Sequence, residues 1–246
     1  MSGTSNGELQ GKRVFITGSA RGVGRGIAEL AINRGAQVVI SDFDEDAAHK
    51  TAADLGAAGV ANCDVTDEAS VVDAIARVQE LLGGLDVLVN NAGIEVAAPL
   101  AMQSTESFDK IFAVNVRGPF VATKAAVPAL AESKGNVVNI ASVAGVGGSP
   151  LLGSYCATKA ALIQLTRVFA VELRQTGIRV NAVCPGFADT SMVDRLAPEF
   201  EAATDAPFGD LVAAKQGRLG TVEDIAEVAC FLCLLYTSPS PRDRQK

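Results

Sequence analysis

The stretch TGSARGVG, residues 17–24, joins a short run of β-branched residues (13–17) to an amphipathic, alanine-rich segment (26–34). Its first glycine, Gly18, can adopt a tight turn that a residue with a Cβ atom disfavours, and the later glycines let a backbone approach a ligand closely. A helix that begins here points its unpaired N–H groups at that ligand, and its dipole favours negative charge. Strand, glycine turn and helix together predict a site for the pyrophosphate of a dinucleotide.

An acidic residue follows the next predicted strand, residues 37–41. Asp42 lies 24 residues after Gly18 (42 − 18), about the distance at which a carboxylate takes the ribose hydroxyls of adenosine. A carboxylate at this place repels the 2′-phosphate of NADP, so the sequence favours NAD, with NADP as the less favoured cofactor. Arg21, a cation within the glycine turn, is the contrary signal, because it could hold a 2′-phosphate.

The alternation of strand and helix patterns continues along the chain. Runs that are apolar throughout indicate strands buried on both faces, and strand–helix alternation indicates a parallel sheet. We expect one α/β domain, residues 11–232, built as a single doubly wound (Rossmann) sheet with helices on both faces, and a flexible N-terminus, residues 1–10. The predicted strands are 13–17, 37–41, 59–62, 85–90, 136–141 and 178–184, and the predicted helical segments are 26–34, 44–54, 68–82, 108–130, 155–175 and 221–232.

Residues 186–220 interrupt this alternation with two prolines and two weak helical stretches, 192–196 and 211–215. A long insertion at the carboxyl end of a strand is where a substrate lid is expected. Together with residues 95–99 and 145–154, residues 187–217 of this segment are expected to form the substrate pocket. Apolar residues there either form a wall of that pocket or pack the lid down. Small sugars, hydroxysteroids, diols and 3-oxo esters all remain possible substrates.

Tyr155 and Lys159 lie four residues apart at the start of a predicted helix, so their side chains share one face. A neighbouring ammonium stabilises a phenolate and lowers the pKa of a tyrosine, which can then exchange a proton with an alcohol or carbonyl oxygen. Ser142 ends a predicted strand, where it would face the same crevice and hold the reacting oxygen. A surface helix pair and a simple turn serine are the alternatives.

Asn115 is a polar residue in an apolar helical stretch, VNV. A buried polar group needs partners, so we expect Asn115 either in a network with water or backbone, or as a satisfied core asparagine.

The composition excludes several classes of function. The chain has 246 residues, and 28 acidic against 21 basic residues give a net charge of −7, which argues against a nucleic-acid partner. No apolar run reaches the roughly 20 residues that span a bilayer, and no secretory signal is evident. The single histidine, His49, lies in a charged segment, so we expect no metal site and no Ser-His-Asp triad. Five cysteines without paired CxxC motifs indicate reduced thiols in a cytoplasmic protein.

Taken together, these motifs resemble the short-chain dehydrogenase/reductase family over residues 11–232. In combination and in this order they are far more specific than any one of them alone. The matching residues are Thr17, Gly18, Gly22 and Gly24, Asp64 in CDV, residues 90–93 (NNAG), Asn115, Ser142, Tyr155 with Lys159, and Pro185 and Gly186 with Thr190.

The resemblance implies a catalytic tetrad of Asn115, Ser142, Tyr155 and Lys159. Tyr155 would be the acid/base, Ser142 would orient the substrate oxygen, Lys159 would bind the nicotinamide ribose and lower the pKa of Tyr155, and Asn115 would hold a water. It also implies reversible hydride transfer between a secondary alcohol and a ketone, often in a homotetramer. The expected cofactor contacts are Gly18, Arg21, Gly22, Val23, Gly24, Asp42, Phe43, Asp64, Val65, Asn91, Ala92, Gly93, Tyr155, Lys159, Pro185, Gly186, Phe187 and Thr190.

The last residues do not fit the family pattern, which usually continues with a final strand. The string CLLYTSPSPRD at 233–243 is the translation of a widely used transposase sequencing adaptor. We therefore expect residues 233–246 to be a non-native tail and the final edge strand to be missing, with a natural Pro/Ser tail as the alternative.

The leading functional hypothesis is an NAD-dependent alcohol dehydrogenase or ketone reductase acting on a small molecule. A 3-oxoacyl-[acyl-carrier-protein] reductase is the runner-up, but its acidic partner needs a basic cleft rim, and the expected rim of Ser133, Lys134 and Thr176 supplies little charge. A non-catalytic dinucleotide-binding protein is the alternative from another class.

Overall fold

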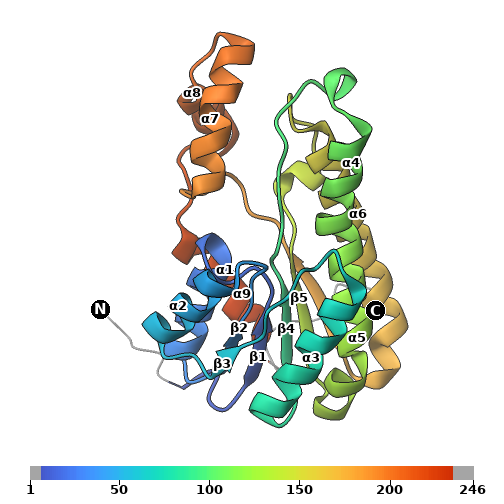
Figure 1. Ribbon diagram of the computed structural model, residues 1–246. Coiled ribbons are helices and arrows are strands. Elements are labelled where there is room, and N and C mark those ends of the chain that lie inside the picture. Colours follow the sequence, from blue (N-terminus) through green and yellow to red (C-terminus); the bar gives the residue numbers. More distant parts are fainter. Residues whose placement is uncertain (1–6, 235–246) are drawn as a thin grey trace, which may run out of the picture.

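The computed structural model describes residues 7–234, and within them the strands form one six-stranded sheet in the order β3-β2-β1-β4-β5-β6 (Figure 1). Every neighbouring pair in this sheet is parallel. The doubly wound sheet predicted from the sequence is therefore confirmed, and each strand falls inside its predicted range. The strands are β1 (Arg13–Ile16), β2 (Gln37–Ile40), β3 (Gly59–Val60), β4 (Val87–Asn90), β5 (Asn136–Ile140) and β6 (Arg179–Val183).

Helices cover both faces of the sheet (Figure 1). One layer is α1 (Gly22–Asn33), α2 (Glu45–Leu55) and α9 (Val222–Cys233), and it shares one apolar core with the strands. The opposite layer, α3 (Glu68–Leu82), α5 (Gly118–Ser133) and α6 (Gly153–Glu172), shares a second core. The strand residues are buried alternately into these two cores, which explains their continuous apolar runs.

The predicted helix 108–130 is not continuous in the structure. It consists of α4 (Thr105–Phe112), a π-helical turn η2 (Ala113–Arg117) and α5, so the helix is wider in its middle. π turns inside helices are rare and frequently lie at functional sites. This one contains Asn115, which is fully buried.

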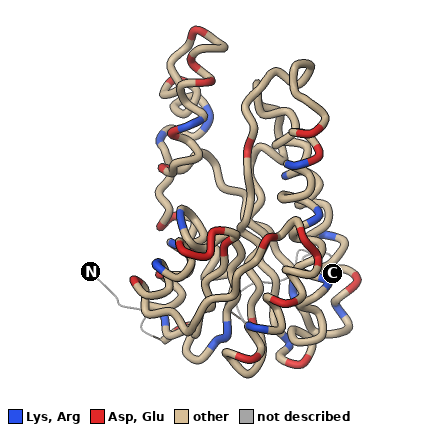
Figure 2. Tube along the Cα trace, in the orientation of Figure 1, with Lys and Arg blue, Asp and Glu red and all other residues tan. Residues whose placement is uncertain are grey.

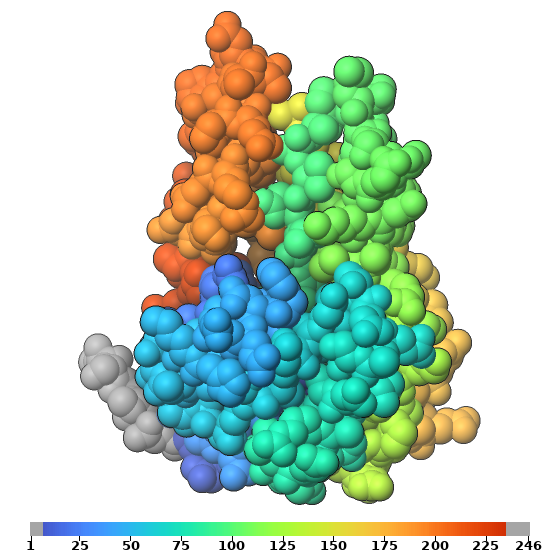
Figure 3. Space-filling model, viewed as in Figure 1, coloured from blue at the N-terminus to red at the C-terminus, as the bar shows by residue number. Residues whose placement is uncertain are grey.

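The segment 186–220 forms two helices, α7 (Ser191–Thr204) and α8 (Phe208–Gln216), which we call the α7–α8 hairpin. It rises beyond the carboxyl ends of the strands, opposite α4 (Figures 1 and 3). A third apolar cluster holds it, in which Phe208 meets Phe187 and Phe200 edge to face. Gln216 also accepts a hydrogen bond from the Phe187 amide (2.8 Å) and donates one to the Phe187 carbonyl (2.7 Å).

Three short 3₁₀ turns complete the described elements: η1 (Leu100–Met102), η3 (Val143–Gly145) and η4 (Leu173–Thr176). Within residues 7–234 no helix is both long enough and apolar enough to cross a bilayer.

The folded part of the chain extends beyond both predicted ends of the domain, to Leu9 and to Cys233. The prediction that residues 1–10 are flexible is wrong for the last of them. Leu9 is fully buried in the first core, and its amide donates to the Arg34 carbonyl (3.1 Å). Of the predicted tail 233–246, Cys233 closes α9, is buried, and its carbonyl accepts a hydrogen bond from Asn136 (3.2 Å). Residues 235–246 lie outside the described residues, and the foreign origin of the tail stays a prediction.

Candidate active site

A single cavity of about 1430 Å³ lies at the carboxyl ends of the strands, between the sheet and the α7–α8 hairpin (Figure 3). It reaches from the glycine turn after β1, past the ends of β2, β4 and β5, to the hairpin. Of the residues predicted for catalysis and cofactor binding, all line this cavity except Gly24 and Asn115. The topology thus brings residues from the whole length of the chain to one hollow, as expected at the carboxyl edge of a doubly wound sheet.

The glycine turn is fitted closely to the loop after β4. Gly18 has φ +63°, and a Cβ atom on it would stand 2.8 Å from the Cα atom of Ala92. Asn91 fixes the turn by donating to the carbonyls of Thr17 (3.0 Å) and Gly18 (2.8 Å). A Cβ atom on Gly24 would collide with the Asn91 side chain and the Gly18 carbonyl. Gly24 therefore serves the packing of the turn and does not face the cavity.

The N-terminus of α1 is open toward the cavity. Arg21, at the N-cap of α1, makes no side-chain capping bond, as is also the case at the N-caps of α5 to α8. Gly22 has φ +57° and open space where a Cβ atom would be. Unpaired N–H groups, a positive helix end and a backbone free of side chain fit the pyrophosphate of a dinucleotide.

Carboxylates surround the position expected for the adenosine. Asp42 is 5% exposed and accepts a hydrogen bond from the Asp44 amide (3.3 Å), while Arg21 lies 2.9 Å from Asp44 and 3.9 Å from Asp42. The Arg21 guanidinium lowers the pKa of Asp44, after the larger effect of the Ala47 amide. Figure 2 shows acidic residues gathered along this part of the strand ends. Phe43, 75% exposed, offers an aromatic face beside them.

Asp64 and Val65 follow β3 and line the same part of the cavity. The Asp64 carboxylate accepts hydrogen bonds from both the amide (2.9 Å) and the hydroxyl (2.7 Å) of Thr66. These bonds hold the loop in place for a ligand that contacts it.

Ser142 and Tyr155 meet across the floor of the cavity. Ser142 follows β5 by two residues, at the N-cap of η3, and its Oγ accepts from the Ala144 amide (3.1 Å) and donates to the Pro185 carbonyl (3.4 Å). Tyr155 lies in the first turn of α6. Burial raises the pKa of Tyr155 to about 12, and a hydrogen bond with the Ser142 side chain opposes that rise.

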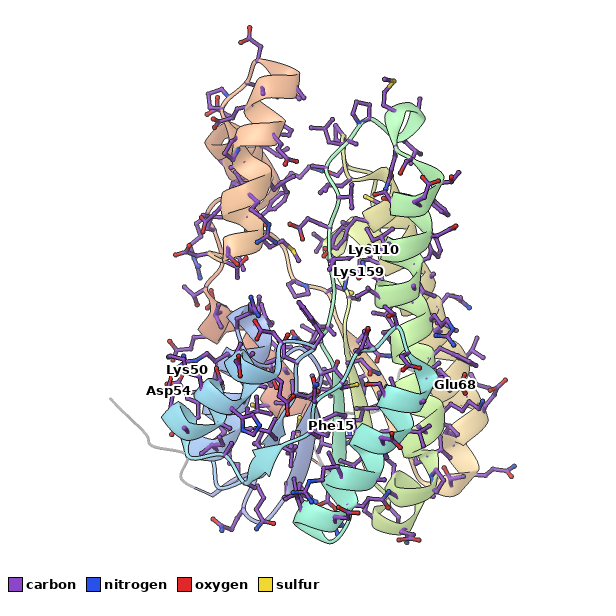
Figure 4. The ribbon with its side chains drawn as sticks, in the orientation of Figure 1. Phe15, Lys50, Asp54, Glu68, Lys110 and Lys159 are labelled. Atoms are coloured by element: carbon purple, nitrogen blue, oxygen red, sulfur yellow. The ribbon has the colours of Figure 1, made fainter. Side chains whose placement is uncertain are left out.

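Lys159 lies one turn later on α6 and is 4% exposed; Figure 4 shows it above the strand ends. Its Nζ donates to the Ile140 carbonyl (2.9 Å) and stands 5.5 Å from the centre of the Tyr155 ring. Burial lowers the pKa of Lys159 to about 8. The pKa of Tyr155 was expected to fall below its ordinary value, and in this structure it rises instead, because burial of the phenol is the largest effect.

Asn115 lies behind the cavity wall and ties it together. Its Oδ1 accepts from the Ile94 amide (2.9 Å), and its Nδ2 donates to the Ile94 carbonyl (2.8 Å) and to Thr158 Oγ1 (3.1 Å). Both N–H groups of the amide are therefore used. The bonds to the Ile94 backbone fit the predicted backbone network, and Asn115 is at the same time a satisfied buried asparagine that links the loop after β4 to the helix of Tyr155.

The prediction that Ser133, Lys134 and Thr176 form the rim of the cleft is wrong. These residues precede β5 and β6, at the amino ends of the strands, so they lie at the opposite edge of the sheet from the cavity. The cations that do line the cavity mouth include Lys110 on α4 and Lys215 on α8. Neither lysine forms an ion pair with another residue between 7 and 234.

Sequence reasoning placed residues 95–99, 145–154 and the lid at the substrate pocket, but it did not single out Glu95, Gly145 or Arg195 within them. Glu95 and Arg195 line the cavity and form an ion pair across it, with 2.9 Å between Oε1 and Nη2. Gly145 lies where η3 touches α6, and a Cβ atom on it would stand 2.6 Å from the Lys159 carbonyl carbon. An acidic residue two positions after the NNAG motif was the one signal available for Glu95.

Comparison with known proteins gives close matches over most of the chain. A family model described as Enoyl-(Acyl carrier protein) reductase matches residues 18–238. Sorbitol dehydrogenase of Cereibacter sphaeroides is 40% identical over 232 residues, covering 91% of each chain. A Xanthobacter autotrophicus protein named inactive 2-(S)-hydroxypropyl-CoM dehydrogenase 2 is 45% identical over 215 residues, covering 84% of this chain and 90% of that protein.

A solved structure matches as well. 3-Ketoacyl-(acyl-carrier-protein) reductase from Brucella melitensis, complexed with NADH, is 33% identical and has a TM-score of 0.81. The similarity covers 92% of this chain and 91% of that chain.

Proposed function

The chain belongs to the short-chain dehydrogenase/reductase family, and from this premise we propose that it transfers a hydride between NAD(H) and a secondary alcohol or ketone. The observation that carries the proposal is that Ser142, Tyr155 and Lys159 line the same cavity as the open N-terminus of α1. A proton-transfer group and a cofactor seat in one hollow are what such a reaction requires.

In this proposal the residues of the cavity move one proton and orient one oxygen. When an alcohol is oxidised, Tyr155 takes the hydroxyl proton while Ser142 holds the oxygen, and in ketone reduction Tyr155 returns the proton. The Lys159 ammonium places positive charge near the phenolate. Bound NAD supplies the hydride chemistry itself. Asn115 is a positioning residue, since its amide holds Ile94 and Thr158 in place.

A Tyr155→Phe variant tests the reaction. We expect its turnover of secondary alcohols, followed by NADH absorbance, to fall by about 10²- to 10⁴-fold, because general acid–base catalysis contributes about that much. NADH affinity, measured by fluorescence titration, should change less than about threefold, since the ring stays in place. Equal turnover by the variant and the wild type would remove Tyr155 from the mechanism.

We propose NAD as the preferred cofactor. Asp42 stands at the end of β2, and Arg21, the cation that could hold a 2′-phosphate, is already paired with Asp44. An Asp42→Ala variant should raise the ratio of NADP to NAD use, measured as kcat/KM for each. No change in that ratio would mean that the cofactor assignment is wrong.

A 3-oxoacyl-[acyl-carrier-protein] reductase is the second candidate, and Lys110 and Lys215 at the cavity mouth favour it. Two lysines without ion-pair partners among the described residues could receive an acidic carrier. Lys110→Glu combined with Lys215→Glu would then raise KM for a carrier-bound 3-oxo chain and leave KM for the free thioester unchanged.

A non-catalytic dinucleotide-binding protein is the remaining alternative, and the relative whose name calls it inactive supports it. NADH binding without turnover of any secondary alcohol or ketone in a broad panel would favour it.

We also propose that the protein is a homo-oligomer, a tetramer by family resemblance, and that it is cytoplasmic. Exposed apolar side chains on α5 and α6, such as Phe120, Val168 and Val171, support self-association. All five cysteines are free thiols, which is typical of a reducing compartment.

A further inference from the structure

Glu95 and Arg195 face each other across the cavity. Glu95 follows β4 in the loop that carries Ile94, and its side chain is only 10% exposed. Arg195 lies on α7 and is 63% exposed. Both line the cavity together with Tyr155, and the charge of Glu95 is near enough to raise the pKa of Tyr155. The proposed proton transfer uses neither residue.

The Glu95 carboxylate has acceptor positions that are open toward the cavity. Among residues 7–234 the donor to this carboxylate is Arg195 Nη2, at 2.9 Å from Oε1. An ionised carboxylate offers about four acceptor positions, and those that Arg195 does not fill are met from the cavity, by solvent or by a ligand that displaces it. Apolar side chains such as Leu152, Val193 and Leu196 line the same cavity and cannot donate. The remaining acceptor positions therefore favour a ligand that carries hydrogen-bond donors.

We propose that Glu95 and Arg195 are a specificity-determining pair that binds a second hydroxyl group next to the reacting carbinol. The pair thereby selects neutral polyols and vicinal diols. The second hydroxyl donates to Glu95 and accepts from Arg195. This proposal rests on the proposed function, since it assumes that Tyr155 reacts with the first hydroxyl.

The same pair disfavours two other classes of substrate. A carboxylate or phosphate group beside the reacting carbon is repelled by the Glu95 carboxylate. Arg195 does not compensate, because its charge is already neutralised by Glu95. A purely apolar alcohol displaces solvent from the open Glu95 oxygen without supplying a donor, and a site that binds a hydroxyl rejects an analogue that lacks it.

The test compares 2,3-butanediol with 2-butanol, which differ by one hydroxyl, in a Glu95→Gln variant. We expect kcat/KM for the diol to fall by about 10- to 100-fold, the effect of losing a hydrogen bond to a charged group. The value for 2-butanol should change by less than about threefold. Arg195→Met, at a well-exposed position where folding is not at risk, should shift the same ratio in the same direction.

Glu199→Gln is the matched control, because Glu199 lies on the exposed face of α7 outside the cavity lining and should leave both values unchanged. An equal fall for both substrates in Glu95→Gln, or an unchanged ratio in both variants, overturns the pair as a determinant of specificity. Failure of the proposed function is a different result, because the wild type would then oxidise neither alcohol.

Discussion

At the residue scale, the chemistry of the site depends on two buried groups, Tyr155 and Lys159, whose pKa values move in opposite directions and away from each other. Burial raises the pKa of Tyr155 to about 12 and lowers that of Lys159 to about 8. Both shifts have the same cause, since a low-dielectric wall disfavours the phenolate and the ammonium alike. The neutral phenol is thus favoured through the neutral range, which suits it as an acid for ketone reduction better than as a base for alcohol oxidation.

The raised pKa of Tyr155 predicts that the rate of alcohol oxidation depends on pH and that the rate of ketone reduction does not. Oxidation needs the phenolate, whose fraction rises about tenfold per pH unit below the pKa of Tyr155, so kcat/KM for 2-butanol should keep rising from pH 7 to 10. Reduction of 2-butanone needs the phenol and should stay level over that range. Initial rates in both directions, in buffers of constant ionic strength, measure this. A plateau of the oxidation rate below pH 8 would show that Lys159 lowers the pKa of Tyr155 after all.

The residues of the site could be predicted where they belong to a local pattern. The glycine turn, Asp42 and the pair Tyr155 and Lys159 are each readable from a few neighbouring positions. Pairings across the chain could not be read. The bond from Asn115 to Thr158 spans 43 residues, and that from Arg195 to Glu95 spans 100. Such contacts depend on how the elements pack, and one sequence does not reveal that.

At the element scale, the catalytic floor depends on a close approach between η3 and α6. A Cβ atom on Gly145 would stand 2.6 Å from the Lys159 carbonyl carbon and 2.8 Å from the Ala160 amide nitrogen. These are backbone atoms, so neither can turn aside as a side chain would. Gly145 therefore sets the distance between Ser142, at the start of η3, and Tyr155 on α6.

Gly145→Ala should consequently damage catalysis more than the fold. Overpacking of this kind costs about 1–3 kcal/mol, while a displacement of about 1 Å at reacting groups can cost on the order of 10²-fold in rate. We expect kcat for alcohol oxidation to fall at least about tenfold, with a decrease of a few degrees in Tm by calorimetry. Gly209→Ala is the control, because Gly209 is exposed, lies outside the cavity lining, and a Cβ atom there meets nothing within 4 Å. Equal kcat values in the two variants would contradict this role of Gly145.

The elements themselves were predicted well where their pattern is uniform and poorly where it is interrupted. Apolar runs located all six strands of the described sheet, because a strand buried on both faces has no polar position to obscure it. The α7–α8 hairpin was expected as two weak helical stretches, although its helices are longer. Pro198 lies inside α7, which weakens the sequence signal, while packing of Phe200 and Phe208 in the third cluster stabilises the hairpin.

At the scale of the whole molecule, the outer surface of α4, α5 and α6 is more apolar than a monomer requires. Phe108 (39%), Phe120 (43%), Val168 (40%) and Val171 (44%) are exposed there, and Phe120 stacks on Phe169 with ring centres 6.1 Å apart. Beside them, Phe112, Val116 and Leu165 line a shallow hollow. Contiguous exposed apolar surface of this kind marks protein–protein contact, and a second copy of the chain is the partner that a homo-oligomer supplies.

A charge placed in this surface should therefore dissociate the oligomer. Phe120→Asp puts a carboxylate where an apolar interface would bury it without a partner, and we expect the mass measured by light scattering after gel filtration to fall from that of the oligomer to about 25 kDa. Val72→Asp is the control, since Val72 is 48% exposed on α3, outside this surface, and should leave the mass unchanged. An oligomer that survives Phe120→Asp would place the interface elsewhere. A wild type that is already monomeric would mean that α5 and α6 remain uncovered in solution, and that the cavity operates within one chain.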